Sequence, residues 1–376
     1  MLEIRFTLAY LFFFALLGVW IPYLAVHLSL SGFGAAVIGM VFSLFLGTRI
    51  VAPYVLQPIL KAGGNVYWCL AGSLLAALLS SVLLLLSNEL WSIVLATLVF
   101  SACWNAALPL LETYCLSMIG ADGGIYSRIR IGGSVGFVLA SMSGGLIFSP
   151  FTLTSFPLLA TITLALCVIS IIALPRQRES GSRKTLFLTQ SQWRSTSLFF
   201  VSCFMLQISH GVYYALFTPL LSEQGFSELE ISSLWSVAVL SEVGVFLMAA
   251  RLFRRFPVAW VLAAGLLVSA VRWWITPVVA SDLYWISTVQ LLHGVSFGAS
   301  HAAAMIWLSK SLPTQSAIAG QALYSALCFG LGGAIGSAVG GLLWEIEPHY
   351  SFVFAGIVSL IGYVIWSLQP KTEARV

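Results

Sequence analysis

The residues of this sequence that could do chemistry are a few ionisable side chains set within long apolar stretches. They are two arginines, two glutamates and three histidines, namely Arg49, Glu112, His210, Glu242, Arg272, His293 and His301. Such side chains are costly in hydrocarbon, and they usually face the interior of a helix bundle, where they bind a ligand or relay protons. With neutral histidines the four charges balance, so we expect opposite charges to meet rather than stay isolated.

Three of these residues suit the binding of an anion together with a proton. The planar guanidinium of Arg272 can hold both oxygens of a carboxylate and never loses its proton. Alternatively, Arg272 is the counter-ion of Glu242. Histidine titrates near neutral pH, which suits His293 for proton coupling beside these two residues. We therefore assign Arg272 to substrate binding and Glu242 and His293 to proton coupling, whereas His210 and His301 fit hydrogen-bonded interior positions.

A second candidate group pairs Glu112 with Arg130 in the next apolar segment. Pro109 can kink the helix before Glu112 and open a position that faces the interior. Arg130 can reach inward to bind substrate with Glu112, or it can simply follow the rule that places basic residues on the cytoplasmic side. Trp20 and Tyr213 are candidate walls for a ring-bearing substrate, although most of the 13 Trp, 12 Tyr and 25 Phe must serve packing.

Several kinds of chemistry are excluded because their motifs are missing. The sequence has no Walker A loop, no GxGxxG after a strand, no HExxH and no metal-ligand cluster. We therefore expect neither an enzyme nor a cofactor, a metal ion or coupling to ATP, and a membrane sensor or membrane enzyme is the disfavoured alternative. The six cysteines lie in apolar stretches without CxxC spacing, which indicates buried apolar side chains. The net charge of +4 reflects membrane topology and not nucleic-acid binding.

The elements that must position these residues are membrane-spanning helices. Of the 376 residues, 60% are apolar and 8% are charged, whereas soluble domains contain about 25% charged residues. A soluble globular protein and a disordered chain are both excluded. A spanning helix needs about 20 apolar residues, and twelve such segments can be marked. They lie at 7–28, 36–60, 66–87, 91–118, 131–149, 156–174, 196–221, 229–250, 257–278, 284–309, 320–344 and 350–368.

The charge pattern sets the topology of these twelve segments. Of the 17 basic residues, all except Arg49 and Arg272 fall in the termini, the central linker or the even-numbered loops. The odd-numbered loops carry acidic residues and no Lys or Arg. The positive-inside rule therefore predicts a multi-pass membrane protein with both termini in the cytoplasm.

The two halves of the chain repeat. Gly32-Phe33 recurs as Gly225-Phe226, 193 residues later, and the same offset places Arg49 on Glu242. Such a pair of opposite charges can fix helix packing or switch partners, and we assign Arg49 as a helix-pairing charge. The repeat predicts an all-α membrane protein of two pseudo-symmetric six-helix bundles, at 1–174 and 196–376, joined by a cytoplasmic linker at 175–195. Parallel six-helix repeats around a midplane site are typical of the major facilitator architecture.

The chain resembles the major facilitator superfamily over its whole length, and within it the proton-coupled branch of 3-phenylpropionate permeases. The resemblance rests on five segments taken together. They are Leu206–Tyr214, Leu234–Val243, Val271–Trp273, Gln290–Gly294 and Tyr126–Ser134. It implies alternating access to a site near the midplane and an aromatic carboxylate as the substrate.

A more distant resemblance is to lactose permease. Glu112 and Arg130 resemble the substrate-binding carboxylate and arginine of that permease, and Glu242, Arg272 and His293 resemble its charged and histidine residues on helices eight to ten. Two departures concern the proton route. Ser296 stands where that permease has its proton-carrying glutamate, and the acidic residues of its helix seven have no match here. If coupling occurs, Glu242, His293 or Glu112 must carry the proton.

Together these observations predict a secondary transporter of the bacterial inner membrane that imports a small aromatic carboxylate with protons. Protonation of Glu242 or His293 would release Arg272 or Arg130 to bind the substrate. The alternative is a proton-coupled sugar or nucleoside symporter in which Glu112 and Arg130 bind hydroxyl groups, and an effluxer is a further possibility. The expected partners are the substrate, protons and the lipid bilayer, with the monomer as the functional unit.

Overall fold

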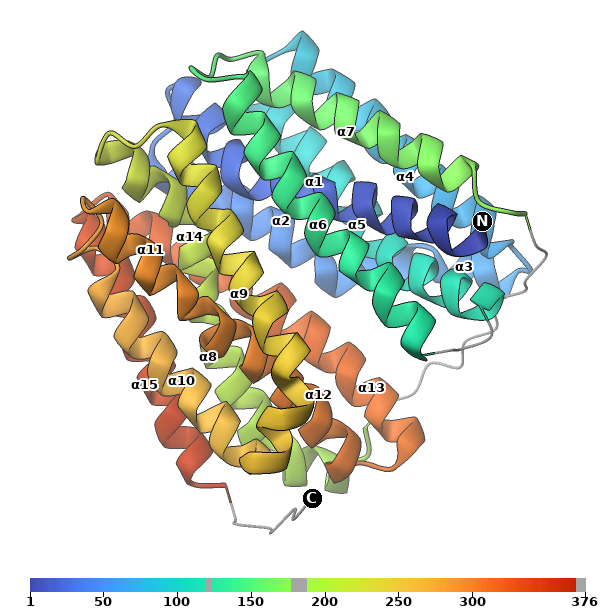
Figure 1. The fold of residues 1–376 in the computed structure, drawn as a ribbon, viewed down its shortest axis with the longest axis vertical. Coiled ribbons are helices and arrows are strands. Elements are labelled where there is room, and N and C mark those ends of the chain that lie inside the picture. Colours follow the sequence, from blue (N-terminus) through green and yellow to red (C-terminus); the bar gives the residue numbers. More distant parts are fainter. Residues whose placement is uncertain (120–122, 177–187, 370–376) are drawn as a thin grey trace. The chain divides into compact units, whose positions relative to one another are not determined.

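The structure is a computed structural model that describes residues 1–119, 123–176 and 188–369 (Figure 1). The described residues form α-helices, two π-helical segments and short connections, with no strand among them. The elements are α1 (Leu2–Leu30), α2 (Ala35–Val55), α3 (Gln57–Lys61), α4 (Val66–Leu86), α5 (Leu90–Ile119), α6 (Gly123–Ile147), α7 (Ser155–Ile172), α8 (Gln190–Glu223), α9 (Glu228–Arg255), α10 (Val258–Ile275), α11 (Leu283–Leu291), η1 (Gly294–Ala299), α12 (Ser300–Ser311), α13 (Thr314–Tyr324), η2 (Ser325–Gly332), α14 (Gly333–Trp344) and α15 (Pro348–Ser367).

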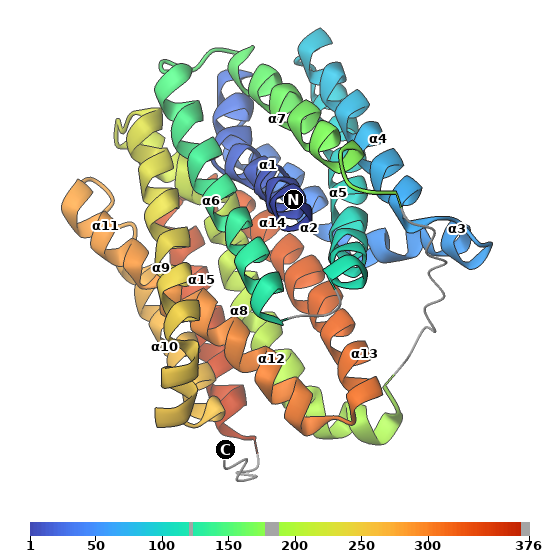
Figure 2. The same ribbon diagram turned by 45° about the vertical axis from the view of Figure 1, so that its right-hand side comes forward.

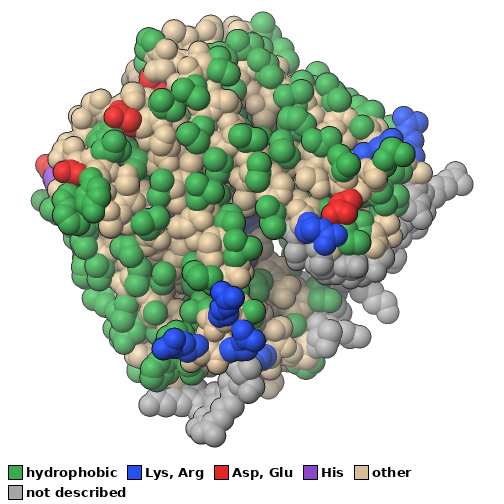
Figure 3. Space-filling model, viewed as in Figure 1, with side chains coloured by type: hydrophobic (Ala, Val, Ile, Leu, Met, Phe, Trp, Pro, Cys, Tyr) green, Lys and Arg blue, Asp and Glu red, His purple; other side chains and the backbone are tan. Residues whose placement is uncertain are grey.

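Twelve helices in the described part of the chain are long and apolar enough to cross a membrane. This confirms the twelve predicted segments and a multi-pass membrane protein. The tenth span runs from Leu283 to Ser311 through η1, and the eleventh runs from Ser316 to Trp344 through η2. Helices suit this environment because each satisfies its own backbone hydrogen bonds without water. In Figure 3, hydrophobic side chains are spread over the face drawn, and its charged side chains are few.

The seventh span begins earlier than the sequence predicts. Helix α8 starts at Gln190, inside the predicted 175–195 linker, and not at 196. Thr189 and Gln192 form a capping box there: the Thr189 hydroxyl accepts from the Gln192 N–H, and the Gln192 side chain accepts from the Thr189 N–H. This reciprocal cap satisfies free donors of the first turn and lets a polar segment start the helix. Residues 177–187 of the predicted linker lie outside the described residues.

The chain divides into two compact units that resemble each other internally. Unit 1 comprises 1–33, 47–183 and 226–236, and unit 2 comprises 34–46, 184–225 and 237–376. In unit 1, α1 packs along α6, and in unit 2, α8 packs along α14 (Figures 1 and 2). A Cβ on Gly18 would lie 2.3 Å from the Phe137 carbonyl oxygen, and a Cβ on Gly211 would lie 2.3 Å from the Gly333 oxygen. The sequence repeat aligns Gly18 with Gly211, so both units use a glycine for the same close helix approach.

Each unit also takes the beginning of one helix from the other half of the chain. The first part of α9 belongs to unit 1, and the first part of α2 belongs to unit 2. A carboxylate holds each of these two segments through hydrogen bonds. Glu228 on α9 accepts hydrogen bonds from the Ser149 hydroxyl (2.8 Å) and the Phe151 N–H (3.1 Å). Glu345 accepts from the Ala36 N–H at the start of α2 (3.0 Å). The predicted halves, 1–174 and 196–376, therefore differ from the observed units at the start of these two helices.

Candidate functional site

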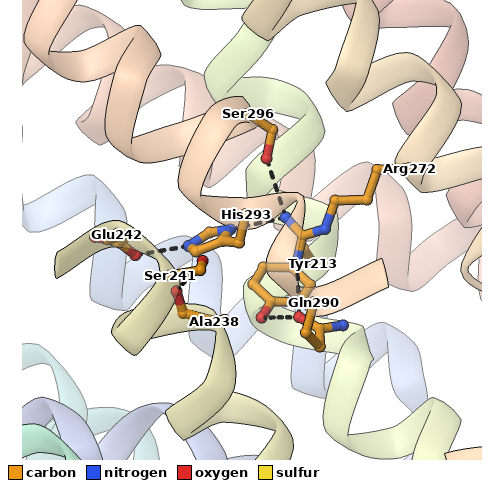
Figure 4. Close-up of polar contacts among 8 residues, drawn as sticks. All are labelled: Tyr213, Ala238, Ser241, Glu242, Arg272, Gln290, His293 and Ser296. Carbon is orange, nitrogen blue, oxygen red and sulfur yellow. Dashed lines mark hydrogen bonds and ion pairs between the residues drawn. The ribbon is translucent and has the colours of Figure 1, made fainter. Parts of the chain in front are cut away.

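A polar cluster in unit 2 contains four of the predicted site residues, Tyr213, Glu242, Arg272 and His293 (Figure 4). Its centre is Arg272 on α10, which is fully buried. Tyr213 comes from α8, Glu242 from α9 and Gln290 from the end of α11, while His293 directly precedes η1. The sequence places these residues on four separate spans, and the fold of unit 2 brings them together.

Two glycines of the tenth span allow α9 to come close to this cluster. A Cβ on Gly294 would lie 2.7 Å from the Ser241 carbonyl oxygen, and a Cβ on Gly298 would lie 3.3 Å from the Cα of Glu242. Both glycines belong to η1, which begins directly after His293. Single π-helical turns within α-helices occur frequently at functional sites. The missing side chains let the backbone of α9 approach, and this sets the distance between Glu242 and His293.

The guanidinium of Arg272 is held from several sides. Its Nη1 lies 2.7 Å from His293 Nδ1 and 3.3 Å from the Ser296 hydroxyl, and its Nη2 donates to Gln290 Oε1 at 2.8 Å. The Tyr213 hydroxyl donates to the same Gln290 oxygen at 2.9 Å. The guanidinium carbon lies 4.5 Å from the centre of the Tyr213 ring, a cation–π distance that stabilises a desolvated cation. These contacts fix the position and orientation of the charge.

Hydrogen-bonding rules determine the protonation of His293. An arginine N–H can only donate, so Nδ1 of His293 must accept from Arg272. The ring proton then sits on Nε2, which lies 2.8 Å from Glu242 Oε1. A neutral His293 therefore donates to Glu242 and links it to Arg272. A second ring proton would place an N–H against the N–H of Arg272, so proton uptake by His293 and the Arg272–His293 bond exclude each other.

The cluster has hydrogen-bond donors that no described residue satisfies. Arg272 Nε, Gln290 Nε2 and Trp273 Nε1 are buried and lack a hydrogen-bond partner among the described residues. A buried donor without a partner is costly, and a ligand with acceptor oxygens would remove that cost. His210 adds a possible acceptor, because its Nδ1 donates to the Leu206 carbonyl at 2.9 Å and its Nε2 is unpartnered. The site is thus complementary to a carboxylate or another oxygen-rich group.

The second predicted pair forms in unit 1. Arg130 Nε lies 4.0 Å from Glu112 Oε1, and the two side chains are 38% and 37% exposed. The Arg130 guanidinium also lies over Phe14 at 4.3 Å and over Tyr10 at 5.6 Å. An exposed ion pair of this length contributes little stability. Both charged groups therefore remain accessible to a ligand, with aromatic rings beside them.

Two other predicted residues have packing partners in unit 1. Arg49 on α2 donates from Nε to Asn105 on α5 at 3.3 Å, which links two helices. Trp20 is 1% exposed, and its ring stacks on Phe100 at 3.8 Å and meets Phe156 edge-on at 5.2 Å. Trp20 thus lies in the core of unit 1, and its contact with substrate stays a prediction.

Sequence reasoning did not identify Gln290 and Ser296 as site residues. Gln290 lies three residues before His293, on the same side of the helix, and that spacing was a usable signal. The role of Ser296 depends on the path of η1, which the sequence did not reveal. His301 stacks with Phe297 and Tyr324, in keeping with its predicted interior position. In the described part of the chain, no three His, Cys, Asp or Glu side chains converge on a possible metal position.

Comparisons with known proteins match this chain to membrane transporters. The model of the MFS_1 like family matches residues 3–354. The chain is 27% identical to a probable 3-phenylpropionic acid transporter of Escherichia coli (strain K12), over 97% of this chain and 96% of that protein. It is 28% identical to a maltose permease of Geobacillus stearothermophilus, over 98% and 94%.

A solved structure is similar in fold. The crystal structure of the nucleoside transporter NupG aligns with a TM-score of 0.85 and 17% identity, covering 98% of this chain and 99% of that one. This likeness confirms the predicted all-α fold. The matched proteins are transporters and not enzymes, and they differ in what their names say they carry.

Proposed function

The chain belongs to the MFS_1-like family of major facilitator transporters, and on that premise we propose that it imports a small aromatic carboxylate with a proton across the bacterial inner membrane. It is a secondary transporter, so an ion or solute gradient must drive accumulation. The observation that carries the proposal is the bonding of Arg272, a buried cation held by a neutral histidine beside unpartnered donors. The distribution of basic residues supports cytoplasmic termini.

The substrate half of the proposal rests on the donors around Arg272. The guanidinium can bind a carboxylate through Nε and one Nη in the bidentate geometry that arginine favours. Gln290 Nε2 can donate to a second oxygen. The rings of Tyr213 and Trp273, whose centres lie 4.5 and 4.4 Å from the guanidinium carbon, provide apolar surface for an aromatic ring. The relative named for 3-phenylpropionic acid supports this substrate class.

The proton half rests on the bridge from Glu242 through His293 to Arg272. In the structure Arg272 is fully enclosed, so the substrate can reach it only after part of this bridge opens. A proton on His293 would remove the acceptor for Arg272 and free the guanidinium. Release of that proton would restore the bridge and displace the carboxylate. Proton and substrate would thus bind in the same state, as symport requires.

The alternative is a proton-coupled sugar or nucleoside symporter that uses Glu112 and Arg130. The observation in its favour is the exposure of this pair beside the rings of Phe14 and Tyr10. A carboxylate and a guanidinium in such a setting can bind hydroxyl groups. The relative named for maltose supports this alternative. Efflux is compatible with either substrate class.

The deciding experiment follows the external pH of energy-free cells when 3-phenylpropionate is added. Symport predicts alkalinisation of the medium, and Glu242→Gln should abolish it. Arg272→Lys should weaken uptake about 10- to 100-fold, because a bidentate charged contact is lost. Glu89→Gln, in an exposed connection, is the matched control and should behave like wild type.

Two different results would contradict the proposed function. A response to a sugar or nucleoside but not to the acid, together with loss of activity in Glu112→Gln, would favour the alternative. Failure of proteoliposomes to move any solute or proton under any gradient would overturn the proposal.

A further inference from the structure

Unit 2 has an apolar groove at the end of α9, outside the polar cluster. A cavity of about 550 Å³ lies between α9, the connection to α10, the first turns of α10 and η1. Its lining is apolar except for two arginines, Arg251 and Arg255. Trp260 is 71% exposed at the rim, and Phe256 and Met248 are also exposed. Exposed apolar side chains on a membrane-spanning helix face lipid, so the groove opens toward the bilayer.

The two arginines carry charges that no described carboxylate neutralises. Arg251 and Arg255 are four residues apart on α9 and therefore lie on the same helix face. Among the described residues, the ion pairs involve other arginines and histidines, and none includes Arg251, Arg254 or Arg255. In Figure 3, basic side chains gather where α9 ends. Favourable interaction with the helix dipole explains basic residues there, but it does not explain an apolar groove beside them.

We propose that this groove binds an anionic phospholipid, with one acyl chain in the apolar part and the phosphate on Arg251 and Arg255. Basic pockets between membrane helices on the cytoplasmic side are suited to anionic head groups. Trp260, in the first turn of α10, has the amphipathic ring that is enriched at the level of the head groups. A zwitterionic lipid would leave the two arginine charges only partly neutralised, so the charge selects an anionic lipid.

The groove adjoins the helices that hold the polar cluster. Val245 and Val295 line it, and they lie three residues after Glu242 and two residues after His293. A lipid chain in the groove would therefore pack against the same part of α9 and η1 that fixes the Glu242–His293 contact. The site is separate from the substrate site, and its occupancy does not depend on which solute is carried.

Native mass spectrometry of the purified full-length protein can test the proposal. Detergent-solubilised protein is titrated with phosphatidylglycerol or with phosphatidylcholine of the same chains, and the bound fraction gives an apparent Kd for each lipid. We expect tighter binding of phosphatidylglycerol. Arg251→Gln and Arg255→Gln should each weaken it about fivefold, and the double variant about 30-fold, from the contribution of one arginine near an anionic surface.

Two further variants distinguish the effect of the groove's arginine charges from the effect of the groove's shape. Arg254→Gln removes the same charge from the same helix end, but it does not line the groove, so it should change the Kd by less than about twofold. Ala264→Phe places a ring in the groove from an exposed position and should weaken the binding of both lipids. Equal affinity for the two lipids, or unchanged phosphatidylglycerol binding in the folded Arg251/Arg255 double variant, would overturn the proposal.

Discussion

The charge balance of the buried cluster makes a prediction for stability that a double-mutant cycle can test. Arg272 contacts His293 at 2.7 Å, and His293 contacts Glu242 at 2.8 Å. With the imidazole ring between them, the two charges lie about 8 Å apart, and at an effective dielectric constant of about 20 their attraction is about 2 kcal/mol. The coupling energy between the two positions should therefore be about 2 kcal/mol.

The variants remove one charge at a time and then both. Glu242→Gln keeps an oxygen that can accept from His293 but loses the negative charge. Arg272→Gln loses the positive charge. Each should lower the free energy of unfolding by about 3 kcal/mol, because it leaves the other charge buried without its counter-charge. The double variant has no unbalanced charge, so its loss should be about 2 kcal/mol smaller than the sum of the single losses.

Unfolding of the purified protein in mixed micelles, followed by helical circular dichroism, measures these differences. Glu223→Gln, at the exposed end of α8, is the matched control and should stay within about 0.5 kcal/mol of wild type. A coupling energy below about 0.5 kcal/mol would mean that Glu242 and Arg272 do not interact through His293. That result would refute the charge assignment on which the proposed proton step depends.

Three further predictions concern other contacts. Gly294→Ala should lower the free energy of unfolding by about 1–3 kcal/mol in the same assay, because its Cβ would meet the Ser241 carbonyl at 2.7 Å. Glu112→Gln should change that free energy by less than about 1 kcal/mol, since its ion pair is long and exposed, and any loss of transport would then reflect substrate binding. Glu345→Gln should cost less than about 1 kcal/mol, and added salt should reduce the difference from wild type, because its carboxylate acts at the start of α2.

Gly244 on α9 provides the control for the Gly294 variant. A Cβ on Gly244 of α9 would have no described neighbour within 4 Å, so Gly244→Ala should be neutral or stabilising. Equal losses from Gly294→Ala and Gly244→Ala would contradict the close-approach argument. A loss of several kcal/mol in Glu112→Gln would show that its pair is structural. A salt-independent loss in Glu345→Gln would argue against an electrostatic contact.

The sequence by itself determined the membrane helices and the repeat. Hydrocarbon requires long apolar segments with internally satisfied backbones, so composition and length identify the spans without tertiary information. The same cost of burial made the few intramembrane charges conspicuous. For this reason Glu242, Arg272 and His293 could be expected to meet, and Glu112 could be paired with Arg130, before any helix was placed in space.

Only the tertiary structure decided which atoms meet. The sequence left open a direct pairing of Arg272 with Glu242, whereas the structure inserts His293 between them and adds Gln290 and Ser296. It also places Trp20 in the packing of unit 1. The physical reason is that periodicity gives the face of a helix but neither its rotation nor its distance from a neighbour. Those depend on side-chain volumes at each crossing, as where Gly294 lets α9 approach η1.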